Sequence, residues 1–254
     1  MIRVLISGIA GKMGQEVWRA VEAADDLMCV GGVDPLGCAD VQLPIYETLA
    51  DALEHETVDV VVDFTAPKVV EDTIQYCLDT DTPIVVGTTG LTDEALCRFS
   101  DQAKSQECGV VVAPNFAIGA VLMMKFAQES AKFFPEAEII EYHHQNKADA
   151  PSGTALKTAA MMSETRLVPP DGVNVGRDDH GDARGYVVHD IPIHSVRLPG
   201  YVAHQEVLLS LPGQTLTIRH DSTERISFMP GVLLAVRKAP VLKGLIYGLE
   251  HLLF

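Results

Sequence analysis

The sequence IRVLISGIAGKMG, residues 2–14, decides the fold because it joins an apolar strand to a helix through three glycines. Residues 2–7 form a short apolar run, and residues 13–23 carry apolar side chains at the three- and four-residue intervals of a helix. Gly8, Gly11 and Gly14 stand at the turn between them. Such a turn lets a pyrophosphate approach the backbone and the free N–H groups of the helix start.

The same alternation continues to residue 114. Helical periods, as at residues 69–79 and 93–105, separate further apolar runs that predict buried strands. These runs are residues 29–34, 58–64, 83–87 and 109–114. Alternating strands and helices predict an α/β fold, a Rossmann-type doubly wound parallel sheet. We therefore expect a dinucleotide-binding domain at residues 1–114.

The pattern changes after residue 114 and predicts a second, α+β domain with a mixed or antiparallel sheet at residues 115–230. Its expected elements are a helix at 118–134, a strand at 137–143, a helix from Ser152, a surface loop at 168–184, and runs that suit an antiparallel sheet at 191–198, 204–210 and 215–220. We expect this domain to bind substrate and to carry the oligomer contacts. Residues 231–254 have a helical pattern and are expected to join the first domain.

The predicted second strand ends at Asp34, about 20 residues after the glycine turn. A carboxylate there can accept hydrogen bonds from ribose hydroxyls, so the fingerprint indicates NADH or NADPH. Asp34 should repel a 2′-phosphate and Pro35 offers no charge, whereas Lys12 is close enough in sequence to pair with one. NADH is slightly favoured. The alternative is that the glycines only form a tight turn and Asp34 only ends a strand.

Two more turns follow predicted strands on the same side of the sheet, where ligands of α/β proteins bind. One contains Gly87, Thr88 and Thr89, and the other contains Ala113, Pro114, Asn115 and Phe116. Both are candidates to contact the nicotinamide and its ribose. Either turn, taken alone, is equally well explained as an ordinary end to a strand.

The densest polar stretch is EYHHQNKADAPSGTA, residues 141–155. Ser152, Gly153 and Thr154 begin a helix and can present backbone amides to an anion, and Lys147 supplies a positive charge for a carboxylate. His143 can exchange a proton near neutral pH. A structural histidine and plain helix capping are the alternative, but they leave the grouping with a lysine unexplained. This loop is therefore the candidate catalytic site.

The composition limits the classes of partner. The net charge of −16 opposes binding to nucleic acid or to an anionic membrane. The five cysteines form no CxxC pair, and the histidines show no metal-ligand spacing, so we expect free thiols and no metal. The chain also shows no export signal and no apolar run long enough to span a bilayer, which favours the cytoplasm.

Six motifs together resemble the dihydrodipicolinate (4-hydroxy-tetrahydrodipicolinate) reductase family of lysine and diaminopimelate biosynthesis. They are GIAGKMG at 8–14, DFTAP at 63–67, VGTTG at 86–90, APNFAIG at 113–119, EYHHQNKADAPSGTA at 141–155 and FMPGVLLAVRKA at 228–239. The histidine–lysine loop is the most specific of them. The resemblance covers the whole chain and implies an NAD(P)H-dependent reductase of a small cyclic dicarboxylate, assembled as a homotetramer.

The resemblance also implies roles for individual residues. His143 would be the acid–base residue, and Lys147 a proton donor that also contacts the substrate. The substrate carboxylates would be held by His144, Gly153 and Thr154. Ser152 is a further candidate for this role because it begins the same helix, as argued above. The cofactor would contact Gly8, Ile9, Ala10, Gly11, Lys12, Met13, Asp34, Gly87, Thr88, Thr89, Ala113, Pro114, Asn115 and Phe116. Many relatives have an arginine where this chain has Pro35, which favours a weaker preference for NADPH.

Two alternatives remain from the residues alone. A different two-domain dehydrogenase would act on an aldehyde or a sugar, but a semialdehyde dehydrogenase needs a cysteine nucleophile, and the polar loop at 141–155 contains none. A regulatory protein that only senses NAD would use the same glycine turn. It would have no need for the histidine–lysine loop.

Overall fold

The computed structural model describes residues 1–38, 41–167 and 183–254, which form two compact units. Unit 1 comprises residues 1–118 and 228–254, and unit 2 comprises residues 119–227. The expected surface loop at 168–184 falls largely outside the described residues. Among the described residues, no helix combines the length and apolar character needed to span a bilayer.

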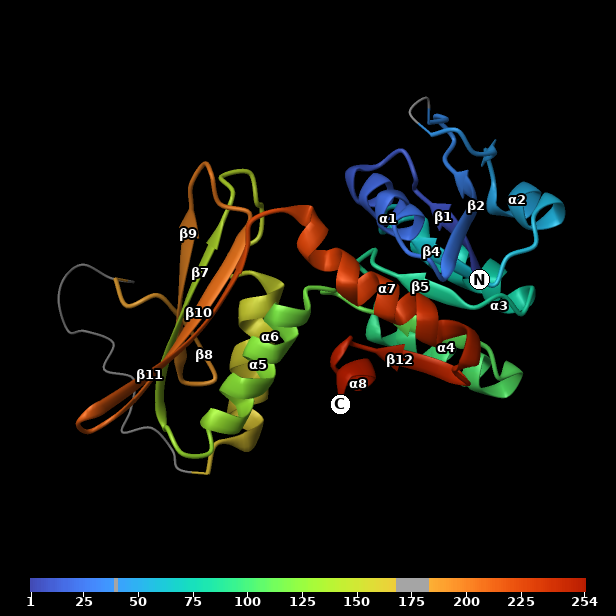
Figure 1. Cartoon of the computed structure of the whole chain (residues 1–254). Helices are drawn as coiled ribbons and strands as arrows, with labels where there is room; N and C mark the ends of the chain where they lie inside the picture. The colour runs from blue at the N-terminus through green and yellow to red at the C-terminus, as the bar shows by residue number, and fades with distance from the viewer. Residues whose placement is uncertain (39–40, 168–182) are drawn as a thin grey trace. The chain divides into compact units, whose positions relative to one another are not determined.

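Unit 1 is built on a seven-stranded parallel sheet with the order β12-β6-β5-β4-β1-β2-β3 (Figure 1). The strands are β1 (Ile2–Ser7), β2 (Leu27–Val33), β3 (Ile45–Tyr46), β4 (Val60–Asp63), β5 (Ile84–Val86), β6 (Gly109–Val112) and β12 (Gly244–Tyr247). The chain reverses direction across the sheet between β1 and β4, the point at which α/β proteins bind their ligands. The predicted Rossmann-type fold is confirmed.

Helices cover both faces of this sheet. They are α1 (Lys12–Glu22), α2 (Leu49–His55), α3 (Val70–Asp79), α4 (Asp93–Gln106), α7 (Met229–Lys238), the 3₁₀ turn η2 (Ala239–Val241) and α8 (Glu250–Leu253). Side chains of α2, α3 and α4 share one apolar core with alternate strand residues such as Leu5 and Val61. The helices α1 and α7 contact one another and pack on the opposite face. Strand residues buried on both sides explain the unbroken apolar runs in the sequence.

The C-terminal segment departs from the expected continuous helix. Helix α7 ends at Lys238, Pro240 lies in a 3₁₀ turn, and Gly244 has a φ of +117°. Proline removes a backbone donor and positive φ ends helical geometry, so the chain cannot continue as a helix. Residues 244–247 instead pair in parallel with β6 as β12. Four residues are too few to show the two-residue period by which a strand is recognised in a sequence, since the segments on either side have apolar spacing of their own.

Unit 2 is a five-stranded mixed sheet with the order β11-β10-β7-β9-β8, with two helices on one face (Figure 1). The elements are α5 (Ile118–Ser130), β7 (Glu136–His143), α6 (Gly153–Thr165), β8 (Tyr186–Val188), β9 (Ile191–Arg197), β10 (Ala203–Leu211), β11 (Gln214–Ser222) and η1 (Arg225–Phe228). The core contains Met162 from α6 and Ile139 from β7. The runs expected at 204–210 and 215–220 pair antiparallel as β10 and β11. The run expected at 191–198 departs from the antiparallel expectation towards β7, because β9 runs parallel to β7, which separates it from β10.

Candidate active site

The glycine turn of unit 1 is held by contacts that leave no room for side chains. Gly8 has a φ of +81°, and a Cβ there would lie 2.6 Å from the carbonyl oxygen of Phe64. A Cβ on Gly14 would lie 2.1 Å from the carbonyl oxygen of Gly8. Glycine is therefore required for the turn itself and for the packing of α1 against β1. Gly11 directly precedes α1, so its neighbouring amides face the space at the helix start.

Asp34 is tied to this turn. Its carboxylate accepts hydrogen bonds from the backbone N–H of Ala10 and of Leu36, both at 3.1 Å. The end of β2 and the glycine turn are thus held together by one half-buried carboxylate. The spacing between Gly8 and Asp34 predicts a carboxylate near the turn, but it does not predict the hydrogen bond to Ala10. Asp34 faces the edge of the sheet at which the turn lies.

The turn after β5 is anchored from below by Asp63, the last residue of β4. Asp63 is fully buried and accepts hydrogen bonds from the hydroxyls of Thr88, at 2.6 Å, and Thr65, at 2.9 Å. Burial raises the pKa of Asp63, although these hydrogen bonds act against the rise. Gly87 is needed here as well, because a Cβ would lie 2.0 Å from the Phe64 ring. Sequence reasoning gave Asp63 no role beyond its place in the DFTAP motif.

A small pocket of about 50 Å³ opens beside the turns after β5 and β6. It is lined by Thr88, Thr89, Gly90, Leu91, Val112, Pro114 and Tyr247. Tyr247 ends β12, the strand that the sequence pattern did not reveal, and so could not be placed here beforehand. Pro114 and Thr89 are exposed at this edge, whereas Ala113 and Phe116 are buried.

All the predicted cofactor residues lie at the carboxyl ends of β1, β2, β5 and β6 in unit 1. Several offer only their backbone. The side chain of Ile9 is fully buried against Gly32, and the Thr88 hydroxyl is committed to Asp63. Lys12, by contrast, is exposed at the start of α1.

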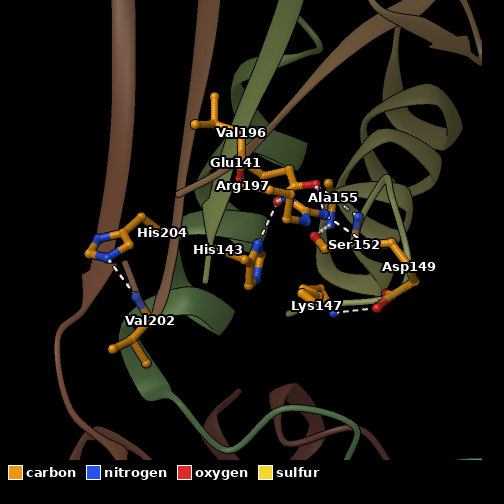
Figure 2. Close-up of polar contacts among 10 residues, drawn as sticks. All are labelled: Glu141, His143, Lys147, Asp149, Ser152, Ala155, Val196, Arg197, Val202 and His204. Atoms are coloured by element: carbon orange, nitrogen blue, oxygen red, sulfur yellow. Dashed lines mark hydrogen bonds and ion pairs between the residues drawn. The ribbon is translucent and has the colours of Figure 1, made fainter. Parts of the chain in front are cut away.

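The predicted catalytic residues lie in unit 2, at the end of β7 (Figure 2). Nδ1 of His143 lies 2.5 Å from Oε2 of Glu141, two residues earlier on the same face of the strand. The side chain of His143 is 12% exposed and that of Glu141 is fully buried. Burial alone would raise the pKa of Glu141, but hydrogen bonds from His143 and Arg197 outweigh it and lower the pKa to about 2. His143 is therefore hydrogen-bonded to an ionised carboxylate.

Arg197, at the end of β9, donates hydrogen bonds to the same carboxylate from both of its terminal nitrogens. Nη1 donates to Oε2 at 2.8 Å and Nη2 donates to Oε1 at 2.7 Å. Nη2 also donates to the carbonyl oxygen of Asp149 at 2.8 Å. The backbone N–H of Ser152 donates to Oε1 of Glu141 at 3.2 Å. One buried carboxylate thereby joins His143 to the loop that precedes α6.

The start of α6 is open towards solvent. Ser152 caps the helix by accepting a hydrogen bond from the N–H of Ala155 at 3.2 Å, so its hydroxyl is already used. Gly153 is exposed, and a Cβ there would meet no atom within 4 Å. Thr154 follows on the first turn of the helix. A helix start next to an open space makes a suitable site for a carboxylate.

Lys147 lies in the loop between β7 and α6, with its side chain 22% exposed (Figure 2). Its ammonium donates to Oδ1 of Asp149 at 2.7 Å, and this hydrogen bond lowers the pKa of Asp149. The positive charge that the sequence offers to a substrate is thus already paired, at the surface. The neighbouring His144 is exposed.

Unit 2 therefore gathers His143, Lys147 and the start of α6 around Glu141 and Arg197. Neither Glu141 nor Arg197 was singled out from the sequence. A glutamate two residues before a histidine on a strand would have been a usable signal, because alternate strand residues share a face. Arg197 could not have been found, since β9 follows β7 by some 50 residues and its position beside β7 is a matter of topology. The described residues contain no group of three potential metal ligands.

A Rossmann sheet with such a glycine turn, joined to a second unit that carries a histidine on a buried carboxylate, is the architecture of a pyridine-nucleotide-dependent oxidoreductase. Comparison with known proteins gives the family. The model "Dihydrodipicolinate reductase, N-terminus" matches residues 2–116, and "Dihydrodipicolinate reductase, C-terminus" matches residues 119–253. The chain belongs to the dihydrodipicolinate reductase family.

Individual relatives match over the full chain. The 4-hydroxy-tetrahydrodipicolinate reductase of Listeria innocua is 48% identical over 99% of this chain and 100% of its own length. That of Mycobacterium sp. (strain KMS) is 49% identical over 99% of each chain. A dipicolinate-bound dihydrodipicolinate reductase from Paenisporosarcina sp. TG-14 is 44% identical over 99% of each chain, with a TM-score of 0.90.

Proposed function

We propose that the chain reduces 4-hydroxy-tetrahydrodipicolinate, the compound for which its relatives are named, to tetrahydrodipicolinate in lysine and diaminopimelate biosynthesis. The observation that carries the proposal is the Glu141–His143 pair beside Lys147 and the start of α6, in a chain of this family. The reaction takes in one substrate, one reduced cofactor and one proton. It releases tetrahydrodipicolinate, the oxidised cofactor and water.

The residues of unit 1 fit a pyridine nucleotide. The turn packs so closely that Gly8 and Gly14 have no room for a Cβ, which brings the turn close to the start of α1. Gly11, just before the helix, leaves the backbone amides there open to a pyrophosphate. Asp34 is placed to accept hydrogen bonds from the adenosine ribose. The turns at 87–89 and 113–116 would contact the nicotinamide end. When bound, the cofactor supplies the hydride.

His143 supplies the proton. Nδ1 is engaged by Glu141, so Nε2 is the nitrogen that faces a substrate. Loss of water from 4-hydroxy-tetrahydrodipicolinate gives a conjugated imine. Hydride from the cofactor would add to it and push electrons towards the ring nitrogen, and a proton from Nε2 of His143 to the carbon of the resulting enamine completes the reduction. Lys147 would exchange Asp149 for a substrate carboxylate and would help to stabilise the developing charge.

The substrate carboxylates are proposed to bind at His144, Lys147 and the start of α6. Gly153 and Thr154 begin the helix, and the absence of a side chain at Gly153 leaves open space beside the helix start. Ser152 contributes by holding the helix start in place through its cap to Ala155. A dicarboxylate therefore suits a site that offers a lysine and helix amides in an otherwise acidic protein.

The finer assignments are also proposals. NADH is favoured over NADPH, because Asp34 repels a 2′-phosphate and Pro35 offers it no cation, while Lys12 keeps NADPH usable. We place the enzyme in the cytoplasm, in keeping with its five free cysteines. A homotetramer is proposed to form through the sheet of unit 2, whose face opposite α5 and α6 carries side chains such as Tyr142 and Arg219.

The proposal is tested by following the loss of NADH absorbance in an assay coupled to the synthase that makes the substrate. His143→Ala and Lys147→Ala should each lower kcat by about 10²–10⁴-fold, with the Kd for NADH unchanged. His194→Ala is the matched control, because His194 is also hydrogen-bonded to a glutamate, Glu138, but on the other face of the sheet. Wild-type rates in both site variants would refute the assignment, and NADH binding without turnover would indicate a regulatory protein.

A further inference from the structure

Glu141 is a fully buried carboxylate that accepts hydrogen bonds on both of its oxygens. Its two oxygens accept from Nδ1 of His143, from both terminal nitrogens of Arg197 and from the N–H of Ser152. The side chain has no exposed surface. Burying a charge is costly unless it is paired and hydrogen-bonded, and here every lone-pair direction has a donor.

We propose that Glu141 is the positioning residue of the site: it fixes the ring orientation and tautomer of His143 and, with Arg197, holds the α6 start in register with that ring. This inference rests on the proposed function and adds a role for two residues that contact no reacting atom. It explains how one side chain, that of Glu141, fixes the positions of both the acid–base residue and the helix start proposed to bind the substrate carboxylate.

The tautomer follows from the chemistry of the pair. An ionised carboxylate can only accept hydrogen bonds, so Nδ1 of His143 must carry its hydrogen. In the neutral ring Nε2 is then the free acceptor, and in the protonated ring it holds the proton that can leave. When that proton moves to the substrate carbon, the Nδ1–H bond to Glu141 stays in place. The ring need not turn during the cycle.

Arg197 fixes the carboxylate itself. Its two parallel hydrogen bonds, at 2.7 and 2.8 Å, set the plane of the Glu141 carboxylate, as a planar guanidinium does best. The further hydrogen bond from Nη2 to the carbonyl oxygen of Asp149 reaches the loop just before α6. Figure 2 shows Arg197 beside Glu141, near the loop that carries Asp149 and Ser152.

The protein contains a matched control on the same strand. Glu138 lies three residues earlier on β7, on the opposite face, and pairs with His194 at 2.8 Å and with Arg184. The residue types are the same, but the Glu138 side chain is 32% exposed and is not linked to a helix start. Changing Glu138 therefore reports on losing a Glu–His–Arg group outside the site. Because Glu138 lies on the sheet face proposed for the tetramer, this variant is compared at the same oligomeric state as the wild type.

The first measurement needs no variant. Nitrogen-15 NMR of histidine-labelled wild-type protein, with His143→Ala to assign the signal, should show the neutral His143 ring as the Nδ1–H tautomer. In Glu141→Gln the amide can donate to Nδ1, so the Nε2–H tautomer should appear. A neutral wild-type ring that carries its hydrogen on Nε2 and not on Nδ1 would overturn the proposal, whether or not any Glu141 variant folds.

The second measurement separates positioning from simple loss of structure. Glu141→Gln keeps an oxygen for Ser152 and Arg197, so the Kd for pyridine-2,6-dicarboxylate should change by less than about threefold, while kcat falls by about 10²–10⁴-fold. Glu141→Asp, which retains the charge, should recover part of kcat, and Glu138→Gln should match the wild type. Equal kcat values in Glu141→Gln and Glu138→Gln would overturn the proposal.

These outcomes are distinguishable from a failure of the proposed function. If the wild type turns over no 4-hydroxy-tetrahydrodipicolinate but shows the Nδ1–H tautomer and its change in Glu141→Gln, the reaction is wrong and the positioning stands. If the wild type is active, His143→Ala is inactive and Glu141→Gln is fully active, the reaction stands and the positioning is wrong.

Discussion

The hydroxyl of Thr88 donates a 2.6 Å hydrogen bond to the fully buried carboxylate of Asp63. This contact joins the end of β4 to the turn after β5, at the edge of the sheet where the cofactor is proposed to bind. The turn is therefore held from inside the protein, and only the backbone of Thr88 would remain to contact a cofactor.

Thr88→Val should weaken NADH binding. Valine has nearly the same shape but cannot donate, so Asp63 would lose a partner and the turn would loosen. We expect the Kd for NADH, measured by calorimetry, to rise about tenfold, equivalent to about 1.4 kcal/mol. Thr82→Val is the control, since Thr82 is equally buried and bonds Thr80 before β5 begins. An equal Kd in the two variants would contradict the prediction.

Acid should destabilise unit 2 through Glu141. Its pKa is about 2 in the folded protein against an ordinary value of 4.5, so its contribution is complete above pH 4.5 and is lost as the pH falls towards 2. A difference of about 2.5 in pKa corresponds to about 3 kcal/mol, of which about 2 kcal/mol is lost by pH 3.

Amide hydrogen exchange in β7 and α6 measures this loss locally. The difference in opening free energy between wild type and Glu141→Gln should shrink by about 2 kcal/mol between pH 6 and pH 3. Other carboxylates titrate in both proteins and cancel in the difference. A constant difference over this range would show that Glu141 is not the group responsible.

Gly153→Ala should impair substrate binding without harming the fold. The backbone at Gly153 is helical and a Cβ meets nothing within the protein, so the melting temperature should stay equal or rise slightly. The same Cβ would occupy the space above the helix amides. We expect at least a tenfold increase in the Kd for pyridine-2,6-dicarboxylate, with NADH binding as the internal control. Unchanged dicarboxylate binding would place the anion elsewhere.

Pro35→Arg should shift cofactor use towards NADPH. Pro35 is exposed directly after Asp34, where a guanidinium can pair with a 2′-phosphate. We expect kcat/KM for NADPH to rise about tenfold, with kcat/KM for NADH nearly unchanged as the reference. If the ratio of kcat/KM for NADPH to kcat/KM for NADH stays at its wild-type value, the adenosine ribose of the cofactor does not bind beside residue 35.

The parallel sheet was predictable because its strands are buried on both faces and its helices carry a clear period, as in β4 and α4. The short elements β3, β8 and β12 were not, since two to four residues cannot display a period. The parallel pairing of β9 with β7 was also beyond the sequence. A strand pattern identifies which residues share a face, but it does not name the neighbouring strand.

The same distinction applies to the site. His143, Lys147 and Gly153 lie within eleven residues of one another, so their grouping could be read directly from the sequence. Arg197 and Asp63 act through contacts that depend on the sheet order, and their partners Glu141 and Thr88 lie 56 and 25 residues away in the chain. In unit 2 the residues expected to touch the substrate were local, whereas Arg197, which holds the Glu141 carboxylate, was not.

The pairing of β12 with β6 means that unit 1 is assembled from both ends of the chain. During synthesis, residues 1–118 emerge with one edge of their sheet open and with α7 absent. Unit 2 is contiguous and can complete its own sheet before β12 leaves the ribosome. The nucleotide-binding unit is thus finished after unit 2, although its glycine turn is made before unit 2.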